Sequence, residues 1–286
     1  MNLSLLPTDV LELVAAQVAD RDGAVAEIND DLRACRLVSR SFAFIFQRHI
    51  FHRGYFADTV SSSQNDASIE QLLAIIETVP QVRIYARSFT LTLSPGRMAP
   101  PRLPSLLDQL QNLTSFAIYC HDLHWLEWRL FQSDFRNSID AISKLPSLRH
   151  LSISGVFGFP ASIILEPLHL SKLEISRLTI DHTMKIELDE VISRPPLHLT
   201  LCAMNAQMIE RWWKQLPNPS LFIGRIHSLK LEHWDRHYME FGSLISIFST
   251  YDCLERLELV LRYCRREGGE CALCTVPFRE ISVSGI

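Results

Sequence analysis

Residues 148–153 (LRHLSI) and 170–175 (LSKLEI) decide the fold of this chain. Both show the pattern apolar-x-x-apolar-x-apolar, whose last two apolar positions alternate as in a strand with one buried face. Clean copies also begin at Leu113, Ile226 and Leu254, and looser copies begin at Ala86, Pro196 and Phe278. Successive copies start 22 to 35 residues apart. A strand recurring at this period predicts an α/β fold built from repeated units.

Helical patterns separate these strands. Two of them place apolar residues at i, i+3, i+4 and i+7: Ile209, Trp212, Trp213 and Leu216, and Leu244, Ile247, Phe248 and Tyr251. One strand and one helix cannot bury an apolar face alone, whereas stacked units can, so we expect a solenoid. The pattern resembles leucine-rich repeats of an irregular kind. An ordinary α/β domain whose strands share a motif is the alternative.

The resemblance departs from the regular repeat at one position. The regular repeat carries Asn or Cys three residues past the last apolar residue, where the side chain bonds neighbouring backbone. The corresponding residues here are His121, Val156, Leu178, Met204, Trp234 and Arg262. These residues form no polar ladder, so regular curvature is not predicted.

The first 55 residues predict a compact unit of three helices. Leu6-Pro7 opens the first helix, because proline is tolerated in a first turn. An acidic segment, residues 20–31, reads as a solvated loop. Asp30 or Asp31 caps a second helix, and Ser39 caps a third. Val14, Leu32 and Phe42 are expected in the core of this unit.

This unit resembles the F-box family, which opens with Leu-Pro, an acidic residue and an apolar helix. Its second half carries an apolar-Val-Ser/Cys-Arg-x-aromatic stretch. The first half is matched by Leu6, Pro7, Asp9, Val10, Leu11 and Val14, and the second by Leu32, Leu37, Val38, Ser39, Arg40 and Phe42. The acidic loop is longer than the family usually has. Leucine-rich repeats often follow an F-box, so the two halves of the chain support each other.

The resemblance implies a substrate receptor of a cullin-based, SCF-type ubiquitin ligase. An F-box docks on a Skp-type adaptor carried by a cullin scaffold, and the repeats hold a protein substrate near the ubiquitin thioester. The adaptor-binding residues it implies are Leu6, Pro7, Val10, Leu11, Leu37, Val38, Ser39 and Arg40. The protein itself performs no chemistry. The alternative is a non-catalytic repeat scaffold whose F-box no longer binds the adaptor.

Three regions follow from these patterns. Residues 1–56 form the F-box-like helical domain and residues 81–286 the leucine-rich-repeat-like domain. Residues 57–80 hold a linker, clearest at 61–66 (SSSQND), and a short amphipathic helix with Ile69, Leu72, Leu73 and Ile76 on one face.

Composition excludes several classes of function. A net charge of −4 gives no electrostatic case for nucleic acid. The longest uncharged apolar stretch is too short to span a membrane. The seven cysteines, without a secretory signal, favour reduced thiols in the cytoplasm or nucleus. The sequence lacks the nucleophile, phosphate-binding and dinucleotide motifs of common enzymes, so neither a catalytic residue nor a cofactor is predicted.

Two weaker patterns remain. Cys264, Cys271 and Cys274 have spacing that can begin a zinc site, with His233 or His237 as a further ligand, and this C-terminal zinc module is a second alternative. His121 and His124 lie beside Trp125 and Trp128 on a helix expected from about residue 122 to 145, where interface or core roles are favoured. Trp212 and Trp213 are adjacent, and one of them is a candidate substrate contact.

Overall fold

The computed structural model describes residues 7–19, 34, 40–57, 62–94, 99–120, 125–167, 169–181, 195–202, 209, 222, 224–233, 254–261, 265–267, 270–272 and 283–284. Its helices are α1 (Thr8–Ala19), α3 (Arg40–Ile50), α4 (Ser62–Thr78), α5 (Val82–Tyr85), α6 (Leu103–Leu107), η2 (Trp128–Leu130), α7 (Ser133–Ser143) and α8 (Ala161–Leu165). Its strands are β1 (Arg53–Ala57), β2 (Ser88–Leu93), β3 (Ser115–Cys120), β4 (Leu126–Glu127), β5 (His150–Pro160), β6 (Lys172–Asp181), β7 (Leu197–Cys202), β8 (Ile226–His233), β9 (Arg256–Leu261), β10 (Arg265–Glu267), β11 (Glu270–Ala272) and β12 (Val283–Ser284).

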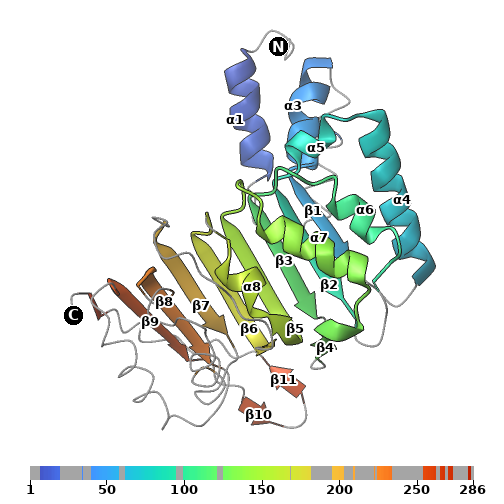
Figure 1. Cartoon of the computed structure of the whole chain (residues 1–286). Helices are drawn as coiled ribbons and strands as arrows, with labels where there is room; N and C mark the ends of the chain where they lie inside the picture. The colour runs from blue at the N-terminus through green and yellow to red at the C-terminus, as the bar shows by residue number, and fades with distance from the viewer. Residues whose placement is uncertain are drawn as a thin grey trace.

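One sheet runs through most of the described chain. Eight strands, β1-β2-β3-β5-β6-β7-β8-β9, lie side by side in the order of the sequence, and each pairs with the next in parallel (Figure 1). β4 adds a short parallel pairing to β5, and β12 pairs antiparallel with β9. β10 and β11 form a separate two-stranded ribbon.

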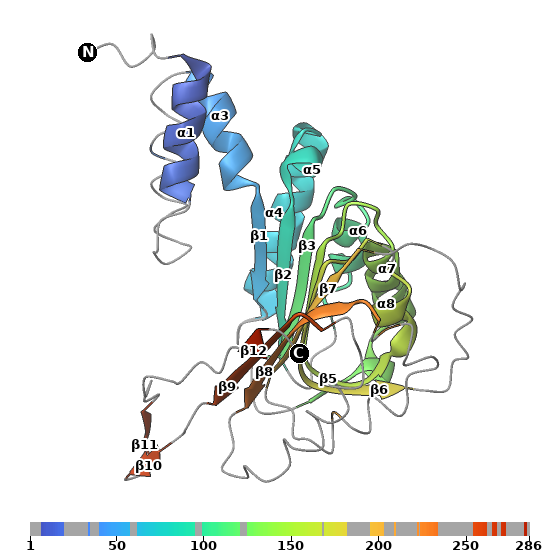
Figure 2. The ribbon, with the colours of Figure 1, turned by 90° about the vertical axis from the view of Figure 1, so that its left-hand side faces the viewer.

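The core lies on one face of this sheet. Two rows of apolar side chains run across the strands in register and are almost completely buried: Phe89, Phe116, Leu151, Leu173, Leu199, Leu229 and Leu257, and Leu91, Ile118, Ile153, Ile175, Leu201 and Leu231. Figure 2 shows α6, α7 and α8 on one side of the sheet, and their buried residues belong to the same core. The alternation in each repeated triple therefore places one face of every strand against the helices.

The repeated triples predicted these strands correctly. Each clean copy from Leu113 to Ile226 has all three apolar residues buried, and Leu257 in the copy at Leu254 is buried as well. The loose copy at Pro196 differs by one residue. Pro196 is exposed and Leu197 is buried in its place, where a register shift lies between Leu197 and His198. The last copy is not a further parallel strand, because Val283 pairs with Leu257 in the antiparallel β12.

Backbone groups tie the starts of the strands together. The carbonyl of His52 accepts hydrogen bonds from the N–H groups of Arg87 and Ser88, and the carbonyl of Arg87 accepts from those of Thr114 and Ser115. Thr114 and Arg149 repeat the arrangement toward the following strands. These main-chain bonds satisfy the backbone groups at the starts of the strands and help to set the register there.

Two strands continue past the point where the repeat was expected to turn. Val156 and Leu178, at the positions of the missing ladder, are buried and pair with each other. The residues just before them, Gly155 and Arg177, have positive φ angles of 74° and 46°. This left-handed step lets β5 and β6 run on for 11 and 10 residues in all.

These features correct the predicted fold class. The chain is α/β, but it is not an N-terminal three-helix unit followed by a leucine-rich-repeat-like solenoid of strand-plus-helix units. It is a mostly parallel sheet whose first strand, β1, begins directly after α3 and pairs with β2. The connecting segments are unlike one another, since α4 has 17 residues and α6 and α8 have 5 each. A solenoid is built from structurally similar units, and the units here are not similar.

Three local expectations also change. α4 begins at Ser62, so much of the stretch read as a linker is helical, although Ile69 and Ile76 are buried as predicted. The single helix expected from about residue 122 to 145 is wrong, because β4, η2 and α7 occupy its described part. Val14, expected in the core, is 43% exposed. Among the described residues, no helix combines the length and hydropathy needed to cross a bilayer.

Candidate functional site

The structure describes only part of the predicted adaptor-binding set. Pro7 and Val10 are exposed at the start of α1, whereas Leu11 is buried against α3. Leu6, Leu37, Val38 and Ser39 lie outside the described residues, as do Leu32 and the side chains of Arg40 and Phe42. Phe51 follows α3 and packs against the main core.

Three rows of polar and small side chains cover the sheet face opposite the core, and we call them the polar face. They are, in register from β2 onward, Ser88, Ser115, His150, Lys172, His198, Ser228 and Arg256; Thr90, Ala117, Ser152, Glu174, Thr200, Lys230 and Glu258; and Thr92, Tyr119, Ser154, Ser176, Cys202 and Glu232. Hydroxyl groups dominate on β2, β3 and β5, and charged groups dominate on β6, β8 and β9, whereas β7 contributes His198, Thr200 and Cys202.

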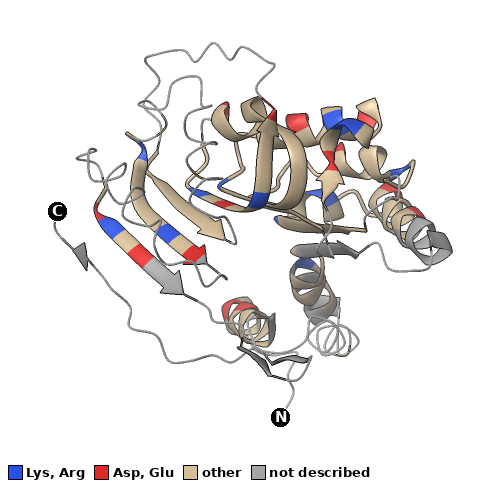
Figure 3. Cartoon of the chain, turned by 90° about the horizontal axis from the view of Figure 1, so that it is seen from below, with Lys and Arg blue, Asp and Glu red and all other residues tan. Residues whose placement is uncertain are grey.

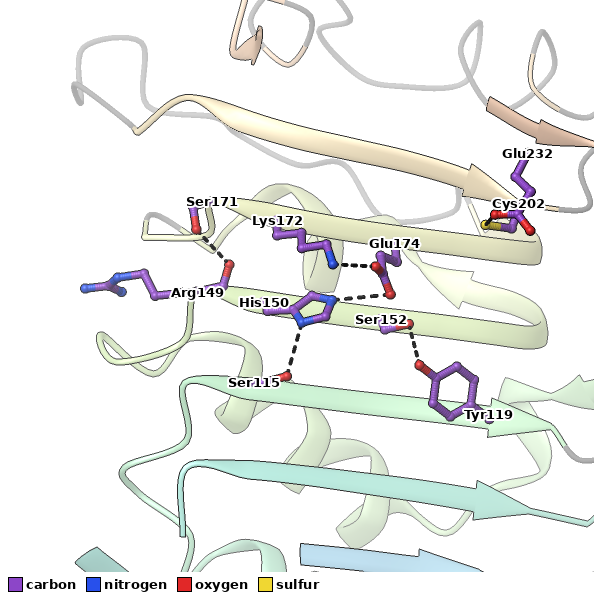
Figure 4. A network of polar contacts seen from close by, with 10 residues as sticks. All are labelled: Ser115, Tyr119, Arg149, His150, Ser152, Ser171, Lys172, Glu174, Cys202 and Glu232. Atoms are coloured by element: carbon purple, nitrogen blue, oxygen red, sulfur yellow. Dashed lines mark hydrogen bonds and ion pairs between the residues drawn. The ribbon is translucent and has the colours of Figure 1, made fainter. Parts of the chain in front are cut away.

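Glu174 is the centre of the network drawn in Figure 4. Its carboxylate lies 2.7 Å from Lys172 Nζ on the same strand and 3.3 Å from His150 Nε2 on β5. Contact with His150 is the largest influence on its pKa, followed by desolvation, which opposes it, and by Lys172. Together they lower the pKa of Glu174 from 4.5 to about 2. The carboxylate is therefore ionised at every physiological pH.

Two further contacts on the same face join β5 to β3. Ser115 Oγ lies 3.2 Å from His150 Nδ1, and Ser152 Oγ donates to Tyr119 Oη at 3.2 Å (Figure 4). Each of these contacts joins β3 to β5. Side-chain pairing therefore adds specificity to the register that the backbone already sets.

A second group of pairs lies on β8 and β9. The Glu258 carboxylate lies 2.9 Å from Lys230 Nζ and 3.5 Å from Arg256 Nη2. The hydrogen bond to Glu258 raises the pKa of Lys230. On the adjoining β7, desolvation and the charge of Glu232 raise the pKa of the Cys202 thiol to about 12. Cys202 is therefore a protonated and unreactive thiol rather than a nucleophile.

The order Ser115, His150, Glu174 is that of a nucleophile, a base and a carboxylate, but acyl transfer also needs donors for an oxyanion. The N–H groups of Thr114 and Ser115 both donate to the carbonyl of Arg87 and are not available for this purpose. Lys172 also competes for the carboxylate. The printed contacts of Ser115, His150 and Glu174 therefore pair these groups with one another across β3, β5 and β6.

Both signs of charge are interspersed over the described chain, as Figure 3 shows, and they do not gather into a patch of one sign. On the polar face, Lys172, Lys230 and Arg256 are matched by Glu174, Glu232 and Glu258. A partner of this face would be recognised by the positions of individual charges rather than by a net field.

The zinc and histidine patterns fall mainly outside the described residues. Cys271 lies in β11 opposite Arg266, with its side chain not described, and Cys264 and Cys274 are outside. The described residues contain no group of three or more potential metal ligands. His121, His124, Trp212, Trp213 and His237 also lie outside, whereas Trp128 is buried.

Sequence reasoning missed the polar face as a unit. The signal was present in the repeated triples, because the residue between the last two apolar positions falls in the row that contains Glu174, Lys230 and Glu258. No protein-family model matches this chain, and no curated protein matches its sequence significantly.

Proposed function

We propose that this chain is a substrate receptor of a cullin-based ubiquitin ligase. In this proposal α1 and α3 dock a Skp-type adaptor, and surfaces of the sheet domain hold a protein substrate. The F-box-like half-motifs of the sequence motivate the proposal. The observation that carries it is an exposed apolar stripe on α1.

The two N-terminal helices have a small core of their own. Leu11 and Ala15 of α1 pack with Ile45 and Phe46 of α3, and these four residues form a buried cluster separate from the main core. Glu12 adds contacts from α1 to Arg48 at 3.4 Å and to His49 at 3.3 Å on α3. The pair is therefore held together independently of the residues that α1 leaves exposed.

The exposed stripe consists of Val10, Leu13 and Val14, which are 39%, 70% and 43% exposed. Their i, i+3, i+4 spacing puts them on one side of α1, and Pro7 is exposed one turn earlier. Clustered apolar side chains on a soluble surface usually mark a protein contact. A helix that presents such a stripe fits a groove of a helical partner.

Co-purification of the full chain with a Skp-type adaptor tests the proposal. We expect a 1:1 complex with the wild type and at least a roughly tenfold loss of affinity in the Val10→Asp, Leu13→Asp double variant, since both changes place charge in an apolar contact. Ile75→Asp is the matched control, because Ile75 on α4 is 37% exposed and lies outside the stripe. Circular dichroism establishes that each variant is folded.

Two outcomes would contradict the proposal. One is a folded wild-type chain that forms no complex, which would leave an interaction scaffold without an adaptor. The other is a complex that the double variant retains at unchanged affinity. The proposal also predicts that the control keeps wild-type affinity.

A further inference from the structure

A second group of exposed apolar side chains lies at the end of the sheet away from α1. Trp125, Leu130 and Phe157 are 42%, 73% and 51% exposed. They come from the segment around β4 and η2 and from the second half of β5. We call these three residues together with Glu127 the end patch. Figure 1 shows β4 at the lower end of the sheet and α1 beyond its upper end.

Strand register places two members of the end patch, Glu127 and Phe157, on one face. β4 pairs with β5 so that Leu126 lies beside Val156 and Glu127 lies beside Phe157 in the register. Leu126 and Val156 are buried, so their neighbours Glu127 and Phe157 project to the opposite side. Trp125 is two residues from Glu127 and, like it, is exposed. Glu127 is therefore the exposed cross-strand neighbour of Phe157.

The end patch rests on a packed aromatic platform. The ring of Trp128 lies 4.7 Å from that of Phe159 at 64° and 5.9 Å from that of Phe131. These edge-on contacts are buried, with Trp128 5% exposed and Phe159 fully covered. Because Trp128 follows β4 directly, it fixes the segment that carries Glu127 and Leu130.

The charges around the end patch favour a cationic partner. Arg129 Nη2 lies 2.8 Å from Asp181 Oδ2, and the pKa of Arg129 is raised chiefly by Asp181 and to a smaller extent by the charge of Glu127. Glu127, Arg129 and Asp181 together contribute two negative charges and one positive charge. Aromatic faces attract ammonium and guanidinium groups, and a nearby carboxylate adds to this attraction.

We propose that the end patch docks a protein segment that presents a lysine or arginine side chain next to a bulky apolar residue. The cationic group would lie against Glu127 and the rings of Trp125 and Phe157, and the apolar residue would cover Leu130. This inference rests on the proposed receptor function, because the docked segment is taken to belong to the protein substrate of that receptor. Its site shares no residue with the stripe on α1.

Selection from a library of random peptides displayed on phage, with the full chain immobilised, provides the test. We expect enrichment of peptides that combine Lys or Arg with a large apolar residue. Replacing the basic residue of a selected peptide by Gln should weaken binding about fivefold, as should Glu127→Gln in the chain. Phe157→Ser should weaken it about tenfold.

Ile84→Ser is the matched control, because Ile84 is 54% exposed on α5 and lies outside the end patch. Its affinity for the selected peptide should be unchanged. Thermal unfolding of every variant separates lost binding from lost structure. A library that yields no binder, or binders without basic residues, overturns the inference. Binders that the Glu127→Gln and Phe157→Ser variants hold as tightly as the wild type also overturn it.

The adaptor experiment and the peptide experiment fail separately. Leu13→Asp should weaken adaptor binding and leave peptide binding unchanged, and Phe157→Ser should do the reverse. Peptide binding without an adaptor complex would contradict the proposed ligase function and would still support the end patch as a docking site. An adaptor complex without peptide binding would remove the end-patch inference alone.

Discussion

The two faces of the sheet come from the same strands but differ in how uniform their side chains are from strand to strand. On the covered face, neighbouring strands align residues of one chemical type, such as Leu151, Leu173 and Leu199. On the polar face the row beside it changes from Ser152 to Glu174 to Thr200. Packing against helices restricts the covered face to apolar side chains of suitable volume. On the polar face, residues from β2, β3 and β5 such as Thr92, Ser152 and Ser154 are buried as well, but their small polar side chains pair with neighbours instead of packing in the apolar core.

The largest expected difference is between two adjacent residues of β5. Ile153 is fully buried on the covered face, and Ile153→Ala should lower the free energy of unfolding by about 2–5 kcal/mol. Ser152→Ala removes only the hydrogen bond to Tyr119 and should cost about 1 kcal/mol. Urea unfolding monitored by circular dichroism measures both. Equal losses would mean that the two faces contribute alike to stability.

Gly155 and Gly158 provide the next comparison, because both have positive φ angles, of 74° and 68°. A Cβ atom on Gly155 would lie 2.5 Å from Cys120 Cβ, whereas one on Gly158 would meet no atom within 4 Å. Gly158→Ala should therefore cost only the left-handed backbone strain, about 1–2 kcal/mol. Gly155→Ala should cost about 1–3 kcal/mol more, because β3 and β5 must move apart. Chemical denaturation of both variants at one temperature measures the two losses in unfolding free energy. Equal losses would show that β3 moves to accommodate the added methyl group at little cost.

Glu174→Gln tests the polar face through pH. Because the folded pKa of Glu174 is lowered from 4.5 to about 2, its stabilisation is complete above about pH 4.5 and is lost as pH falls toward 2. Removing the charge should cost about 1–3 kcal/mol at pH 7. The wild type should lose more stability than the variant between pH 5 and 2.5 in urea titrations. Parallel pH profiles would show that the ion pairs of Glu174 do not stabilise the fold.

The smallest effect is expected at Arg177 on β6. This residue has a φ angle of 46° and lies level with Gly155 on β5, which also has a positive φ angle. Arg177→Gly removes the steric cost of the left-handed conformation and should stabilise the protein by up to about 1 kcal/mol. The gain is reduced by the extra freedom of glycine in the unfolded chain. A raised melting temperature would support this reading. A lowered one would show that the contacts of the arginine side chain outweigh the strain.

The repeated triples predicted β2, β3 and β5 to β9 because their signal is local, whereas β1, β4, β10 and β11 were not predicted. Each triple alternates within a few residues, and Leu113, Phe116 and Ile118 are buried as expected. Extension of β5 and β6 past the triple was not predicted, since Arg177 carries no signal for a positive φ. The break of the expected long helix into β4, η2 and α7 depends on pairing between Glu127 and Phe157, which are far apart in the sequence.

The candidate surfaces were predicted unevenly for the same reason. Pro7 and Val10 belong to the adaptor-binding set that the family resemblance implies, and both are exposed. Leu11 was placed in the same set but is buried against α3, a contact that helical spacing alone does not reveal. The contact of Glu174 with His150 joins residues from different repeated triples, so it requires the register between strands.

The order of the strands has a consequence for synthesis of the chain. Each of the eight parallel strands pairs with the strand before it, so no later strand has to insert between two that are already paired. The sheet can therefore grow at one edge as the chain leaves the ribosome, with the carbonyls of His52, Arg87, Thr114 and Arg149 receiving the starts of β2, β3, β5 and β6 in turn. Closing each short connection costs less entropy than closing a distant one. Folding of this sheet is thus expected to follow the direction of translation.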